Sequence, residues 1–184
     1  GKTTLADALA LKIRGEVIYE PYDENPYLAR SYKGRDELAL NSQIYFLLSR
    51  SQQLGTHSLE SNEVYISDYV FEKELIYADR TLKENEAGLY RQIYERFKSE
   101  VYPPVLLLYV SDSVENCLEK IRIRHREFEQ NIPREFLEGL FKDYEKLISE
   151  WSQCPVIKLD MCKFDCNRDG DLEWLFKQVK EYIT

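Results

Sequence analysis

Four short apolar runs, separated by segments with helical patterning, constrain the fold of this 184-residue chain more than any other feature. They are Val17–Glu20, Val64–Asp68, Val105–Val110 and Val156–Asp160. Runs of this length, rich in β-branched, leucine and aromatic residues, are typical of strands buried in a sheet. Their alternation with helices predicts an α/β fold built on a doubly wound parallel sheet.

Helical patterning fills the intervals between these runs. The expected helices cover Glu37–Gly55, Asn85–Val101, the periodic stretch Val114–Ile121, a segment opened by Pro133 that ends near Trp151, and about Leu172–Ile183. No internal repeat, low-complexity tract or Pro/Gly-rich linker interrupts this order. Residues 1–184 are therefore expected to form a single domain.

Composition narrows the possible partners and the compartment. The hydrophobic fraction of 43% and charged fraction of 32% are those of a soluble globular protein. A net charge of −8 argues against general nucleic-acid binding, which needs surplus Lys and Arg, and no apolar run reaches membrane length. The four cysteines (Cys117, Cys154, Cys162 and Cys166) have no zinc spacing. We therefore expect reduced thiols in a cytoplasmic protein with no nucleic-acid or membrane partner.

The chain opens with Gly1-Lys2-Thr3-Thr4, which matches the end of the phosphate-binding loop G-x-x-x-x-G-K-[ST] where it runs into a helix. In that loop backbone N–H groups surround phosphates, the lysine reaches the β/γ-phosphates and the hydroxyl binds Mg²⁺. We expect all four residues to bind ATP phosphates and Thr3 to bind Mg²⁺. We also expect a hydrophobic strand and the glycine-bearing half of the loop ahead of Gly1, so that this chain is truncated within its P-loop.

Two strand ends carry acids: Glu20 closes the first run and Asp68 the second. Ligands of doubly wound folds bind at the carboxyl ends of strands, and carboxylates beside a phosphate-binding helix are a phosphoryl-transfer arrangement. Glu20 is expected to accept the proton of a substrate hydroxyl, and Asp68 to hold Mg²⁺. The alternatives are a solvated strand-end acid for Glu20 and a helix cap for Asp68.

Three segments resemble parts of the deoxynucleoside kinase family, particularly its bacterial purine-type members. They are the substrate-site segment Tyr19–Leu28, the nucleobase helix Asn41–Arg50 and the arginine-rich lid Ile123–Pro133. The resemblance covers nearly the whole chain in order. It implies a P-loop NTPase fold with a five-stranded parallel sheet, whose first strand would precede Gly1. It also implies 5′-phosphorylation of a deoxynucleoside by ATP with Mg²⁺, and a homodimer formed through the two long helices.

The lid segment concentrates positive charge. Arg124 and Arg126 lie close together, with Lys120 one turn earlier, and such cations repel one another unless anions bind among them. The resemblance assigns Arg124 and Arg126 to the triphosphate, where they would stabilise transition-state charge. The alternative is a solvated basic patch that is partnered by Glu127 and Glu129.

Tyr32 and Glu129 are carried over from the resemblance as the pair that holds the sugar 3′-hydroxyl, since a phenol can donate and a carboxylate can accept. The chain departs from the animal enzymes of the family at Asp68-Tyr69-Val70, where those enzymes carry an acid-Arg-Ser triplet, whereas bacterial relatives look similar to this chain. The acid carries over but the arginine does not, so another group must do its work.

One helix face carries an amide, an aromatic ring, an aliphatic group and a guanidinium, namely Gln43, Phe46, Leu47 and Arg50. This stripe suits a nucleobase, because the amide can read its edge and the ring can pack on its face. A glutamine amide matches adenine or cytosine, whereas guanine is better met by the carboxylate and cation of Glu74 and Lys73. Deoxyadenosine is therefore the expected best substrate, with deoxyguanosine or deoxycytidine as secondary ones.

Two other functions stay open at this point. A nucleoside monophosphate kinase of the thymidylate type shares the loop, lid and sheet, but needs cations for its acceptor phosphate where Glu20-Pro-Tyr-Asp-Glu24 is acidic. A non-catalytic nucleotide-binding P-loop module would have no need of Glu20, Asp68, Arg124 and Arg126 together.

Overall fold

The computed structural model describes residues 1–32, 36–60 and 62–183. Its strands are β1 (Glu16–Ile18), β2 (Tyr65–Ser67), β3 (Leu107–Ser111) and β4 (Val156–Asp160). Its helices are α1 (Lys2–Ile13), α2 (Leu28–Tyr32), α3 (Ala39–Gln53), α4 (Lys73–Thr81), α5 (Glu84–Lys98), α6 (Val114–Arg124), α7 (Arg134–Ser149) and α8 (Asp169–Lys180). Two short 3₁₀ helices, η1 (Asp36–Leu38) and η2 (Glu127–Glu129), join them.

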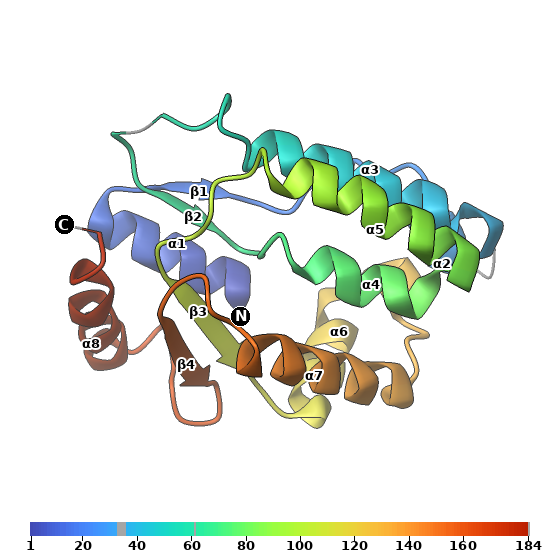
Figure 1. The fold of residues 1–184 in the computed structure, drawn as a ribbon. Helices are drawn as coiled ribbons and strands as arrows, with labels where there is room; N and C mark the ends of the chain where they lie inside the picture. The colour runs from blue at the N-terminus through green and yellow to red at the C-terminus, as the bar shows by residue number, and fades with distance from the viewer. Residues whose placement is uncertain (33–35, 61, 184) are drawn as a thin grey trace.

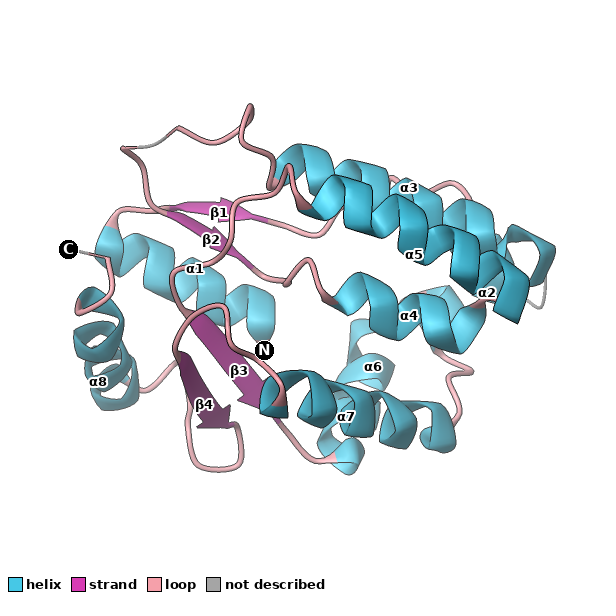
Figure 2. Ribbon diagram, in the orientation of Figure 1, coloured by secondary structure: helices cyan, strands magenta, loops and turns pink. Residues whose placement is uncertain are grey.

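The strands pair in parallel, which confirms the α/β class (Figure 2). In β1 and β2, Val17 lies opposite Ile66, and in β3 and β4, Leu107 lies opposite Val156. Among the described residues these form two separate two-stranded sheets. The expected fifth strand was placed ahead of Gly1, so the five-strand count stays a prediction.

The two acids that were expected to close the first two strands, Glu20 and Asp68, lie just after those strands. β1 ends at Ile18 instead of Glu20, and Asp68 directly follows β2. The reason is that the Glu20 backbone N–H donates to the Asp68 side chain (3.0 Å) and not to a strand partner. The ladder therefore stops before Glu20.

One hydrophobic core is shared by both strand pairs. Leu5 and Leu9 of α1 cluster with Leu159 of β4, Leu175 of α8 and the partly buried Ile66 of β2. Figure 1 shows α1 lying among these strands, with α8 beside it. Burial of α1 against both pairs therefore fixes the position of its first turn, which carries the GKTT sequence.

Helix α4, whose bounds were not predicted, is packed on two sides. Its Ala78 belongs to a core cluster with Leu47 of α3 and Tyr90 of α5, whereas its Ile76 packs with Leu137 of α7. Figure 1 shows α3, α5 and α4 together, with α7 and α6 beyond α4. This double packing holds the first turn of α4 in place.

The other differences from the predicted elements are small. The short helix α2 was not expected, α7 ends at Ser149 and leaves Trp151 outside it, and α8 begins at Asp169 instead of about Leu172. All four cysteines are free, as expected. In the described part of the chain, no helix combines the length and apolar character needed to cross a membrane.

Candidate active site

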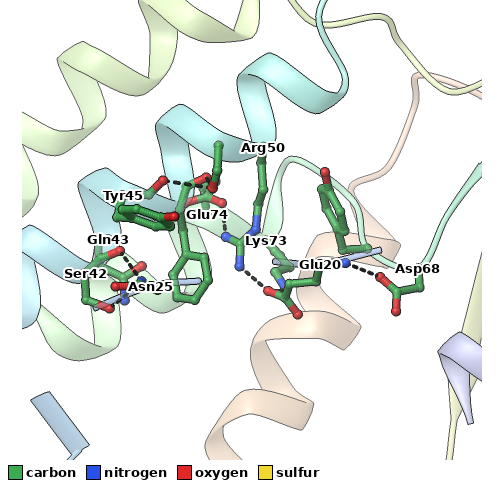
Figure 3. Close-up of polar contacts among 12 residues, drawn as sticks. Glu20, Asn25, Ser42, Gln43, Tyr45, Arg50, Asp68, Lys73 and Glu74 are labelled. Carbon is green, nitrogen blue, oxygen red and sulfur yellow. Dashed lines mark hydrogen bonds and ion pairs between the residues drawn. The ribbon is translucent and has the colours of Figure 1, made fainter. Parts of the chain in front are cut away.

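Polar side chains from four separate segments meet at the carboxyl ends of β1 and β2 (Figure 3). Glu20 follows β1, Asp68 follows β2, Arg50 comes from α3, and Lys73 and Glu74 form the first turn of α4. Strands that run in parallel bring their carboxyl ends to one edge, which is where such folds bind ligands. The structure therefore brings both predicted strand-end acids together.

The Glu20 carboxylate is held by two cations. Its Oε1 accepts hydrogen bonds from Arg50 Nη2 and from Lys73 Nζ, both on nearly buried side chains. Burial by itself would raise the pKa of Glu20, but the charges of Lys73 and Arg50 outweigh burial and lower the pKa to about 2. The Glu20 carboxylate is thus ionised at neutral pH, which is the charge state that its predicted role as a proton acceptor requires.

Arg50 bridges two carboxylates. Its Nη1 donates to Glu74 Oε1 and its Nη2 to Glu20, while the guanidinium lies 4.2 Å from the centre of the Phe46 ring. Burial opposes the charge of Arg50, but Glu74 and Glu20 outweigh it and raise the pKa of the guanidinium. The second oxygen of Glu74 accepts from the Tyr90 hydroxyl. Arg50 is therefore permanently charged and fixed in orientation.

Asp68 joins the helix start to the strand end. Its Oδ2 accepts from the Thr3 hydroxyl (2.6 Å) and its Oδ1 from the Glu20 backbone N–H (3.0 Å). The alternative role as a cap on α4 is not supported, because the cap position is Glu72 and makes no side-chain cap bond. A hydroxyl next to a carboxylate suits Mg²⁺, which is usually bound through one or two carboxylates together with water and phosphate oxygens.

The predicted phosphate-binding residues form the exposed start of α1. Gly1 is the N-cap, and Lys2, Thr3 and Thr4 make up the first turn. The first N–H groups of a helix have no partner within it, and the helix dipole favours anions at this end. The arrangement therefore fits a phosphate beside Asp68.

The two arginines of the predicted lid are paired with one carboxylate. Arg124 ends α6, and Arg126 follows a left-handed His125 (φ 52°). Arg126 Nη1 donates to Glu129 Oε1 (3.1 Å), Arg124 Nη2 donates to Oε2, and the Arg126 guanidinium stacks on Tyr22 at 3.3 Å from the ring centre. The pairing with Glu129 that the basic-patch alternative predicts is thus present. To bind phosphate, the two arginines would have to leave Glu129.

Tyr32 and Glu129, the predicted sugar pair, lie on neighbouring segments. The Tyr32 ring at the end of α2 meets the edge of Phe128 in η2, with ring centres 5.8 Å apart. Burial, with Tyr77 and Glu129 nearby, raises the pKa of Tyr32. Tyr32 therefore remains a protonated donor at neutral pH.

On the predicted nucleobase face, Gln43 and Phe46 are buried. The Gln43 Oε1 has no hydrogen-bond partner within the described residues. A buried amide oxygen left unpaired is costly, so this atom is available to a ligand donor. Leu47, in contrast, is fully buried in the core against Tyr90.

Lys73 and Glu74 depart from their predicted role as readers of a base. The Lys73 ammonium is bound to Glu20, and the fully buried Glu74 has both oxygens engaged, by Arg50 and Tyr90. The cause is the first turn of α4, which faces α3 and the segment after β1. Direct contact of Glu74 with a base would require one of its partners to leave.

Sequence reasoning missed two tyrosines and an asparagine near these residues. Tyr22 lies under Arg126, and Tyr69 donates to Gln53 Oε1 (2.7 Å). The buried Asn25 donates to Ser42 Oγ (3.1 Å) and orders the substrate-site segment. Two features of the sequence could have pointed to them: the Asn25-Pro26 pair pointed to an ordering role for Asn25, and Tyr69 stands where the animal enzymes carry an arginine.

Comparisons with known proteins identify the family of this chain. A family model described as deoxynucleoside kinase matches residues 1–184. The chain is 32% identical to the deoxyguanosine kinase of Bacillus subtilis, over all of this chain and 93% of that protein. It is 29% identical to the deoxyadenosine/deoxycytidine kinase of the same organism, over all of this chain and 88% of that protein.

The fold also matches solved structures. Deoxyadenosine kinase from M. mycoides, in a structure with bound dATP, has a TM-score of 0.83 and 22% sequence identity, covering 98% of this chain and 94% of that one. A second structure of that enzyme, with dCMP as product, has a TM-score of 0.81. The family match spans the whole chain, and the relatives include the bacterial purine-type enzymes that the sequence resembles. This chain therefore belongs to the deoxynucleoside kinase family and is a phosphotransferase.

Proposed function

We propose that this protein transfers the γ-phosphoryl group of ATP to the 5′-hydroxyl of a deoxynucleoside in a Mg²⁺-dependent reaction. The observation that carries the proposal is the position of Asp68, which is bonded to the Thr3 hydroxyl on one side and to the Glu20 backbone on the other. A proton acceptor thus lies directly beside the predicted phosphate and metal ligands. This is the arrangement that phosphoryl transfer to a hydroxyl requires.

Each group has a distinct part in the reaction. The ionised Glu20 accepts the proton of the 5′-hydroxyl as that oxygen attacks phosphorus. Gly1, Lys2, Thr3 and Thr4 hold the triphosphate, while Arg124 and Arg126 leave Glu129 to neutralise the transferring group. Thr3 and Asp68 would hold Mg²⁺, which supplies positive charge to the phosphate oxygens. Tyr32 and Glu129 orient the sugar through its 3′-hydroxyl.

For the substrate we propose a purine deoxynucleoside, with deoxyadenosine preferred. The free Oε1 of the buried Gln43 can accept from the exocyclic amine of adenine, and the adjacent side-chain N–H₂ can donate to a ring nitrogen. The deoxyguanosine and deoxyadenosine/deoxycytidine kinases among its relatives support this substrate class. Arg50 and Phe46 would border the base.

The charges around Glu20 do not support the alternative of a thymidylate-type monophosphate kinase, which needs cations there for its acceptor phosphate. Tertiary structure does bring two cations there, Arg50 and Lys73, but Glu20 and Glu74 neutralise both. The site therefore has no net positive charge for an acceptor phosphate. A non-catalytic module is excluded by membership of a kinase family across the whole chain.

We also propose a homodimer through α3 and α5, which pack side by side (Figure 1). Each carries a large exposed apolar side chain, Leu48 at 42% and Leu89 at 52% exposed. The molar mass in solution, measured by light scattering, should be twice that of the chain. A Leu48→Glu, Leu89→Glu double variant should be monomeric.

A single panel tests the proposed function. The four deoxynucleosides are compared by kcat/KM with ATP and Mg²⁺, and deoxyadenosine 5′-monophosphate and thymidine 5′-monophosphate serve as control acceptors. Deoxyadenosine should be the best substrate, EDTA should abolish turnover, and the monophosphates should be inactive. Turnover of a monophosphate in preference to every nucleoside would contradict the proposal.

A further inference from the structure

The two oxygens of the Glu20 carboxylate differ in their partners. Oε1 accepts from both Arg50 Nη2 and Lys73 Nζ, whereas Oε2 has no hydrogen-bond partner among the residues that the structure describes. Two cations on one oxygen restrict rotation of the carboxyl group. They leave the other oxygen as the acceptor for a substrate proton.

Tyr69, which stands where the animal enzymes carry an arginine, packs against both cations. Its ring lies 5.6 Å from the Arg50 guanidinium and 5.7 Å from Lys73 Nζ, and its hydroxyl is anchored on Gln53. An aromatic face attracts cations, so the ring supports both of them. A positive charge therefore does reach this place in the fold, from Lys73 at the start of α4.

We propose that Lys73 is a positioning residue for phosphoryl transfer. Together with Arg50, its ammonium occupies Glu20 Oε1 and so presents Oε2 to the 5′-hydroxyl of the substrate. This inference rests on the proposed function, because it assumes that Glu20 is the base.

Lys73 is the member of the cation pair that can lose its charge. Burial lowers the pKa of Lys73 to about 8, with a further contribution from Arg50 that is partly offset by Glu20. The titratable and charged groups that face Lys73 are Glu20 after β1, Arg50 of α3, Lys2 of α1, Tyr69 after β2 and Tyr77 of α4. Arg50 stays protonated, so above about pH 8 Glu20 would keep one cation instead of two.

Three substitutions at Lys73, to Met, Arg and Ala, test the proposal in the full chain with ATP, Mg²⁺ and the best deoxynucleoside. Lys73→Met should lower kcat by roughly 10- to 100-fold with little change in KM, because a misplaced reacting group costs rate. The wild-type kcat should fall above about pH 8. Lys73→Arg should keep its kcat there, since arginine does not deprotonate. Lys142→Met, an exposed lysine on α7, is the matched control.

Chemical rescue separates positioning from folding. Added alkylamines should restore activity to Lys73→Ala, and the pH at which the rescued activity is lost should follow the pKa of the amine. Lys73→Met with wild-type kcat would overturn the proposal, as would Lys73→Ala that folds by circular dichroism but gains nothing from amines. If wild-type protein turns over no deoxynucleoside, it is the proposed function that has failed.

Discussion

The Thr3 hydroxyl donates a 2.6 Å hydrogen bond to Asp68 Oδ2 and thereby ties the first turn of α1 to the end of β2. The two residues are 65 positions apart in the chain. Packing of α1 against both strand pairs brings them together, so the proposed metal ligands are preformed.

Thr3→Val and Asp68→Asn should each weaken Mg²⁺ activation, because each removes one oxygen ligand. The Mg²⁺ concentration for half-maximal rate should rise by roughly 10- to 100-fold, a range typical of disturbed metal sites. Rates measured across a Mg²⁺ series at saturating ATP check this. Thr56→Val, an exposed threonine away from the site, is the control and should leave the curve unchanged.

Glu20→Gln should lower kcat by about 10²–10⁴, the usual effect of removing a general base. The amide keeps the size of the carboxylate and one acceptor oxygen but is a very poor proton acceptor. Glu24→Gln, which changes an exposed neighbour, should retain wild-type kcat. Equal rates for Glu20→Gln and the wild type would show that another group takes the proton.

Acid should remove the stabilisation that Glu20 provides. The pKa of Glu20 is about 2 in the folded protein against an ordinary value of 4.5, so between these two values the unfolded chain binds more protons than the folded protein. The contribution is complete above pH 4.5 and is lost as the pH falls toward 2. Urea unfolding from pH 7 to 3 should show the stability advantage of wild type over Glu20→Gln shrinking by about 2 kcal/mol. A constant difference would contradict the two-cation environment.

Gly139→Ala should stabilise the protein less than Gly88→Ala does. Both glycines lie in long helices, where alanine is favoured by about 1 kcal/mol. A Cβ at Gly139 would overlap the Arg80 guanidinium and displace it from its ion pair with Asp143, whereas the space around Gly88 is open. Thermal unfolding should show equal gains for the two changes once Arg80→Ala is introduced. A persisting difference would mean that Arg80 is not the cause.

Gln43→Leu should reduce kcat/KM most strongly for deoxyadenosine. The edge of the base would lose its partner inside a buried site, at a cost of about 1–3 kcal/mol. Gln52→Leu, on an exposed position of the same helix, is the control. Measurements on all four deoxynucleosides check the prediction, and a thymidine preference in the wild type would contradict the purine assignment.

The sequence by itself determined the features that depend on local pattern. Alternating apolar runs and helical segments predicted parallel strands, and all four strands lie at or within two residues of the expected positions. The position of Glu20 and Asp68 after β1 and β2 followed from the same pattern, because parallel strands present their carboxyl ends at one edge. The predicted α7 begins directly after Pro133, as expected for a proline at a helix start.

Tertiary structure alone decided which charges pair. The bounds of helix α4 were not predicted, because its first turn buries Lys73 and Glu74, and charged residues on a buried face do not show in a hydrophobic pattern. Lys73 meets Glu20 across 53 residues and Arg50 meets Glu74 across 24. Periodicity shows which side of a helix is buried, but the partner of a buried charge depends on which elements pack against it. For that reason the sequence could mark Glu20 as the candidate proton acceptor, and only the fold showed the two cations that hold its carboxylate.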